Sequence, residues 1–117
     1  MYRYNIDQKN NTVYCIFTKT FNDLYNKSKT ITVIGKAKCS PDDKFDEKIG
    51  QDIAYKRALI KYLKVVRSEY EEILKYGDFD RLLRFADQIE NISRTIEIQS
   101  KELSTLVSND KESWKNF

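Results

Sequence analysis

The sequence predicts an α+β fold, in which a small antiparallel β-sheet near the N-terminus is followed by two long α-helices. Residues 1–40 contain runs of β-branched and aromatic side chains separated by short polar connections, which is typical of antiparallel strands. Residues 46–109 instead repeat apolar side chains at steps of three and four, which is the period of an amphipathic helix. The length of 117 residues fits a single domain.

Three strands are expected within residues 1–40. The segment from Tyr2 to Asp7 is predicted to be an edge strand, and residues 12–18 and 30–39 are predicted to form the other two. The polar turn from Gln8 to Asn11 joins the first two strands, because asparagine tolerates left-handed backbone angles. Short connections of this kind favour an antiparallel meander of three strands.

The last predicted strand has two chemically different faces, because side chains alternate along a strand. One face should carry small and apolar side chains, and the other should carry two lysines. The first set is Val33, Gly35, Ala37 and Cys39, and the second is Lys36 and Lys38.

Two helices account for the rest of the chain. The segment from Ser40 to Asp43 ends the sheet, because proline cannot continue a central ladder and aspartate favours turns and helix starts. The first helix is expected over residues 46–76, beginning near Asp46 or Ile49. Gly77 is a candidate C-cap for this helix, and Asp78 is placed to cap a second helix over residues 78–109.

The second helix carries a heptad seam, with seam positions at alternating steps of three and four. The seam packs either against the chain's own first helix or against a second copy of the chain. A helix of about 45 Å, at 1.5 Å per residue, is long for so small a core, which favours an oligomer. The seam residues are Leu82, Phe85, Ile89, Ile92, Ile96, Gln99, Leu103 and Leu106.

Composition excludes several classes of function. The sequence has no histidine, and Cys15 and Cys39 lack metal-binding spacing, so no metal site or cofactor is expected. No GxSxG, P-loop or GxGxxG motif is present, so an enzyme is the least favoured class. We expect both cysteines to be buried reduced thiols in a cytoplasmic protein. We expect no contact with a membrane, because no apolar run is long enough to span one.

The junction between the last strand and the first helix is the candidate binding site. A helix N-terminus favours a bound anion, arginine can pair with phosphate or stack on a base, and aromatic rings offer stacking surfaces. The alternative is a well-capped junction with a solvated basic rim, in which Arg57 only pairs with Asp52 or Asp46. The candidate ligand-binding residues are Lys36, Phe45, Tyr55, Lys56, Arg57 and, entering from a partner chain, Arg94.

The same junction resembles a known family. The segment from Gly35 to Asp46 reads GKAKCSPDDKFD and continues through Gly50, Ile53, Ala54, Arg57 and Ala58. This pattern is similar to that of short phage and prophage proteins, in particular the first type of Thoeris anti-defence protein. The resemblance implies a small sheet with long helices, assembled into dimers or hexamers in the cytoplasm of a bacterial host. It also implies a sponge that binds a cyclic ADP-ribose isomer without cleaving it.

Three functions therefore stand as expectations. The first is a phage-encoded anti-defence protein that sequesters a cyclic nucleotide immune signal, either a cyclic ADP-ribose isomer or a cyclic oligonucleotide. The second is a phage accessory protein that binds nucleic acid or inhibits another protein. The net charge of only +3 disfavours nucleic acid. The third is a structural oligomer without a ligand.

Overall fold

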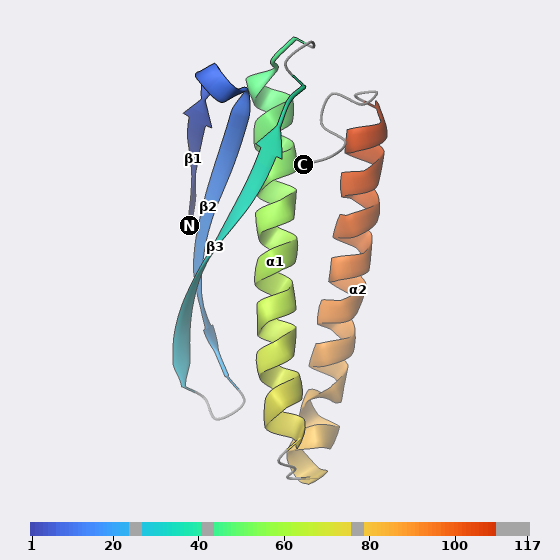
Figure 1. Cartoon of the computed structure of the whole chain (residues 1–117). Helices are drawn as coiled ribbons and strands as arrows, with labels where there is room; N and C mark the ends of the chain where they lie inside the picture. The colour runs from blue at the N-terminus through green and yellow to red at the C-terminus, as the bar shows by residue number, and fades with distance from the viewer. Residues whose placement is uncertain (24–26, 41–43, 76–78, 110–117) are drawn as a thin grey trace.

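Three strands and two helices follow one another in the order that the sequence predicts. The computed structural model describes residues 1–23, 27–40, 44–75 and 79–109. The elements are β1 (Tyr2–Asp7), a short 3-10 helix η1 (Gln8–Asn10), β2 (Thr12–Asn22), β3 (Ser28–Lys38), α1 (Glu47–Lys75) and α2 (Phe79–Asn109). Figure 1 shows three layers, with α1 between the sheet and α2. The α+β prediction is confirmed.

The sheet is an antiparallel meander in the order β1-β2-β3, as expected. Asn11, after η1, has a φ of 51° and so supplies the left-handed residue that this turn needs. The β2–β3 ladder is longer than the sequence predicts, because hydroxyl groups pair across its far end. Thr18 pairs with Thr32 at 3.0 Å and Thr20 with Thr30 at 2.8 Å.

The first helix begins where Asp46 caps it. The carboxylate oxygen Oδ1 of Asp46 accepts hydrogen bonds from the backbone nitrogens of Lys48 at 3.0 Å and Ile49 at 3.3 Å. These two amides have no partner within the helix, so the cap satisfies them. The predicted caps Gly77 and Asp78 lie outside the described residues. Among the described helices, none is both long and apolar enough to cross a membrane.

The core lies between the sheet and α1. The predicted alternation of β3 is confirmed, because Gly35, Ala37 and Cys39 are buried whereas Lys36 is exposed. Cys15 and Cys39 are fully buried, and burial raises the pKa of the Cys15 thiol. The fully buried side chains of this core are Val13, Cys15, Ala37, Cys39, Ile53, Ala54 and Ala58.

Gly35 sets how closely α1 approaches β3. A Cβ atom at this position would overlap the backbone oxygen of Ala54 and would lie 2.5 Å from the backbone nitrogen of Ala58. Two alanines on the helix and a glycine on the strand therefore let the two backbones touch. This contact positions the residues that flank Ala54 and Ala58 on α1 against the edge of β3.

The heptad seam of α2 packs on α1 of the same chain. Ile96 is only 7% exposed, and Ile89, Ile92, Leu103 and Leu106 are half-buried against the core. The side chains of Leu82 and Phe85 lie outside the described set. Of the two arrangements that the sequence leaves open, the described seam residues therefore show packing within the same chain. Whether the protein forms an oligomer stays a prediction.

We expect Gly35→Ala to destabilise the fold by roughly 3 kcal/mol or more, because the new methyl group meets rigid backbone rather than a side chain that can move. Urea denaturation followed by circular dichroism measures the change. Ile34→Ala is the matched control, since Ile34 is the neighbouring residue on the exposed face, and we expect a much smaller loss. Wild-type stability of Gly35→Ala would contradict the close contact.

Ile96→Asp should unfold the chain, because burying a carboxylate against α1 costs roughly 3–5 kcal/mol. Ile98→Asp lies on the same helix, where Ile98 is 55% exposed, and should stay folded. Circular dichroism and light scattering of the two variants give the answer. A folded, monomeric Ile96→Asp protein beside an oligomeric wild type would show instead that the seam is an interface between chains.

Stability should fall at alkaline pH. Burial is the main cause that raises the pKa of Tyr4 from 10.0 to about 12, and it also raises the pKa values of Tyr62 and Tyr70. The tyrosine hydroxyl groups lose their protons at lower pH in the unfolded chain than in the folded one. The contribution of these tyrosines to the free energy of unfolding is therefore complete below pH 10 and is lost as the pH rises through the folded-state pKa values. Urea midpoints measured across this range should decrease, and less steeply for Tyr4→Phe. A flat profile would contradict the assignment.

Candidate functional site

In the part of the chain that the structure describes, two hollows flank the α1–α2 hairpin. The larger, which we call the groove, encloses about 660 Å³ and is lined by Asp52, Tyr55, Lys56, Lys101, Glu102, Thr105 and Leu106. The smaller, which we call the basic pocket, encloses about 350 Å³ and is lined by Lys36, Arg57, Ile60, Lys61 and Leu103. Only the basic pocket includes a residue of the sheet among its described lining residues.

The two hollows lie on different sides of the contact between the helices. Successive residues of an α-helix are about 100° apart around its axis, so the neighbours Lys56 and Arg57 face different directions. Lys56 reaches across to α2, whereas Arg57 reaches back to β3. Ile60, which is buried, lies between them on α1.

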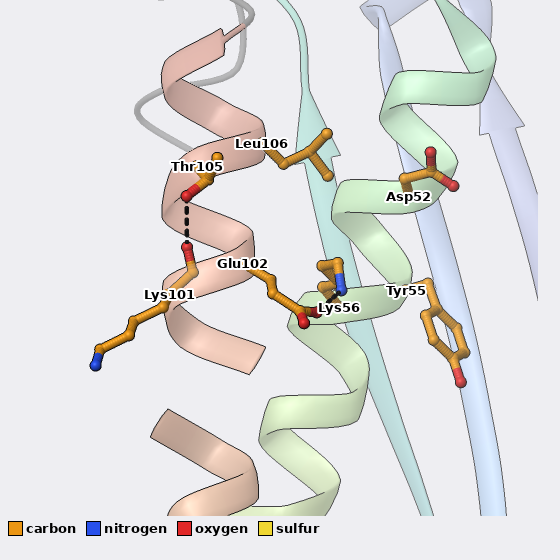
Figure 2. A pocket seen from close by; sticks show the side chains of 7 residues that line it. All are labelled: Asp52, Tyr55, Lys56, Lys101, Glu102, Thr105 and Leu106. Carbon is orange, nitrogen blue, oxygen red and sulfur yellow. Dashed lines mark hydrogen bonds and ion pairs between the residues drawn. The ribbon is translucent and has the colours of Figure 1, made fainter. Parts of the chain in front are cut away.

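Figure 2 shows how the groove is built from one helix on each side. The ammonium group of Lys56 donates to Gln99 Oε1 at 3.1 Å and to Glu102 Oε2 at 2.7 Å. This bridge ties the two helices together at one end of the groove. Leu106 points from α2 toward α1 (Figure 2), so the groove has an apolar wall beside its charged groups.

An ordered aromatic ring and an exposed lysine complete the groove. The ring of Tyr55 has its centroid 4.9 Å from that of Tyr2 and 6.1 Å from that of Phe17. These contacts fix the orientation of Tyr55 before any ligand binds. Lys101 pairs with Glu97 at 3.5 Å, but its side chain is 78% exposed, so this pair holds it weakly.

The basic pocket brings three cations to the edge of β3. Arg57 Nη1 donates to the backbone oxygen of Lys36 at 2.8 Å, and Lys61 Nζ donates to that of Ile34 at 2.7 Å. Burial lowers the pKa of the Arg57 guanidinium below its ordinary value. The described residues that line this pocket include no carboxylate, so its lining is positively charged.

The structure divides the predicted site. Lys36 and Arg57 meet in the basic pocket, whereas Tyr55 and Lys56 line the groove. These four residues therefore do not share one hollow within the described chain, because adjacent helix positions face different sides, and their role in binding a ligand stays a prediction.

Two predicted residues line neither hollow. Phe45 is half-buried against the core. Arg94 is exposed and pairs with Glu90 at 2.7 Å on its own helix, and its entry into a partner's site stays a prediction. Arg57 Nη1 donates to the backbone oxygen of Lys36, and a pairing of Arg57 with Asp52 or Asp46 stays a prediction.

Sequence reasoning missed several lining residues. Lys61 follows Arg57 by one helical turn, so the spacing of four would have indicated that both face the same side. Lys101, Glu102 and Leu103 could not be found in this way, because their place opposite α1 depends on the register of the hairpin.

Comparisons with known proteins give no relative for this chain. No protein-family model, no curated protein and no solved structure matches it. The two hollows and their chemistry are therefore what indicates a function for this chain.

Proposed function

We propose that this chain is a non-catalytic binding protein that sequesters a cyclic nucleotide signal, and that the groove is its ligand site. The observation that carries the proposal is the combination of an ordered tyrosine ring, two lysines and two carboxylates around one hollow of about 660 Å³. Small-molecule sites commonly have this size and this mixture of apolar and polar groups.

The groups of the groove match the parts of a cyclic nucleotide. The base stacks on Tyr55, whose ring is already held by Tyr2. One phosphate pairs with Lys56 on α1, and Lys101 on α2, whose side chain points away from α1 in Figure 2, turns toward the groove to pair with the other. The carboxylates of Asp52 and Glu102 accept hydrogen bonds from ribose hydroxyls and from exocyclic amino groups. Sequestration needs no proton transfer, so a sequence without histidine is compatible with it.

The ion pair between Lys56 and Glu102 does not block this binding. The Lys56 side chain is 24% exposed and that of Glu102 is 52% exposed, so solvent reaches the carboxylate more than the ammonium group. A ligand phosphate can replace the carboxylate as the partner of Lys56, because it supplies the negative charge that the less exposed ammonium group needs. The basic pocket offers no aromatic surface among its described residues, which is why the groove is the better nucleotide site.

The proposal includes the biological setting that the family resemblance implies. The chain acts in the cytoplasm of a bacterial host as a phage-encoded anti-defence protein, and it assembles into a dimer or hexamer. An elongated shape of 55 × 24 × 17 Å and two exposed apolar side chains on α2, Leu83 and Ile98, support assembly. Light scattering of the wild-type protein checks this part, and a compact monomer would remove it.

Calorimetric titration with cyclic ADP-ribose isomers and cyclic dinucleotides tests ligand binding. Tyr55→Leu keeps the apolar bulk but removes the ring, and Lys101→Gln removes an exposed charge. We expect each to weaken binding by about tenfold, since a stacked base or a charge-assisted contact is worth roughly 1–3 kcal/mol. Tyr55→Phe should bind like the wild type. Lys48→Gln is the control for charge, because Lys48 is exposed on α1 and lines neither hollow.

Three outcomes would contradict the proposal. The first is a wild-type protein that binds none of these ligands, and the second is a Lys48→Gln variant that weakens binding as much as Lys101→Gln. The third is a cleaved product in the mass spectrum of the released ligand, which would indicate an enzyme. Tight oligonucleotide binding that weakens steeply with salt would favour the nucleic-acid alternative, since binding to many phosphates releases many counterions.

A further inference from the structure

We propose that the basic pocket is a separate binding site for a phosphate group, which is held by the open edge of β3 together with Lys61 and Arg57. This site does not depend on the function proposed for the groove.

β3 is an edge strand, because the sheet order is β1-β2-β3. The backbone nitrogen of Cys39 donates to the backbone oxygen of Asn11, the residue before β2, at 2.8 Å. The backbone groups of the odd-numbered residues of β3 are therefore the ones that bond to β2. In an antiparallel ladder the N–H and C=O of one residue point to the same side, and successive residues alternate. The backbone N–H and C=O groups of the even-numbered residues, including Ile34 and Lys36, therefore point to the open edge.

Two side chains of α1 confirm this direction. The carbonyl groups of Ile34 and Lys36 accept hydrogen bonds from Lys61 and Arg57, respectively. The amide N–H of Lys36 lies between these two carbonyls on the same edge. An N–H donor is thus flanked by a guanidinium and an ammonium group, which is the arrangement that binds an oxyanion.

The carbonyl group of Ile34 holds the Lys61 ammonium group in place but does not neutralise it, because a carbonyl carries no net charge. Lys36 and Lys61 form no ion pair with any residue in the described part of the chain. Like charges gathered in one hollow raise the local positive potential and attract an anion. A bound phosphate would supply the missing negative charge.

The size and walls of the pocket select the ligand. Its volume of about 350 Å³ is roughly half that of the groove, and its described lining offers no ring on which a base can stack. Ile60 is buried and Leu103 half-buried, so an apolar surface lies beside the cations and strengthens their attraction for charge. The pocket therefore recognises the phosphate group itself rather than a base.

Titration of the ¹⁵N-labelled protein with inorganic phosphate tests the site directly. At constant ionic strength, the Lys36 amide signal should shift and saturate at about millimolar phosphate, and sodium chloride should not reproduce the shift. Adenosine monophosphate and adenosine are the other two probes. Tighter binding of the monophosphate would identify a phosphate ester as the natural ligand, and tighter binding of inorganic phosphate would identify the free ion. Either result supports a phosphate site.

Lys61→Gln is the decisive variant, because Lys61 is exposed and its loss should leave the fold intact. We expect phosphate binding to weaken by about tenfold. Lys64→Gln is the matched control, since Lys64 is an exposed lysine one turn along the same helix that does not line the pocket, and it should bind phosphate like the wild type.

Three results would overturn the proposal. They are an unsaturable shift at Lys36, equal losses in Lys61→Gln and Lys64→Gln, or a response to adenosine as strong as that to its monophosphate. Cyclic nucleotide binding without any phosphate response at Lys36 would remove this site and leave the groove proposal standing. A phosphate response at Lys36 without cyclic nucleotide binding would support this site and remove the groove proposal.

Discussion

The contact between Gly35 on β3 and Ala54 and Ala58 on α1 is the constraint on which the rest of the structure depends. No side chain separates the two backbones at this point, since a single Cβ on Gly35 would overlap the helix. The helix therefore lies directly against the strand, and its next side chains reach the carbonyl groups at the edge of β3. Arg57 and Lys61 make these contacts because Gly35 lets α1 lie so close to β3.

The central position of α1 follows from the breadth of its apolar surface. One side of the helix buries Ala54 and Ala58 against the sheet, and another side buries Ile60 and receives α2. α2 runs along α1 on the side away from the sheet (Figure 1). The seam between the two helices is therefore open on two sides, with the groove on one and the basic pocket on the other, and α1 contributes residues to both.

The two hollows differ in how their charges are balanced. In the groove, Lys56 pairs with Glu102 and Lys101 with Glu97, so the positive groups already have carboxylate partners nearby. In the basic pocket, Lys61 donates to a backbone carbonyl, which orients a cation without cancelling its charge, and neither Lys61 nor Lys36 forms an ion pair with a described residue. The groove thus suits a ligand with both polar and apolar parts, and the basic pocket suits a simple anion.

The sequence by itself determined the α+β class, the antiparallel meander, the alternation along β3 and the start of α1 at Asp46, because each depends on neighbouring residues and on a local period. It also indicated Lys36 and Arg57 as neighbours of the sheet–helix junction. Only the tertiary structure decided that Tyr55 and Lys56 face a different hollow, that Ile96 packs within its own chain, and that Lys101 and Leu103 lie opposite α1. These three features depend on how far each helix is rotated about its axis and on the register of the two helices. Both are set by contacts between residues that are distant in the sequence.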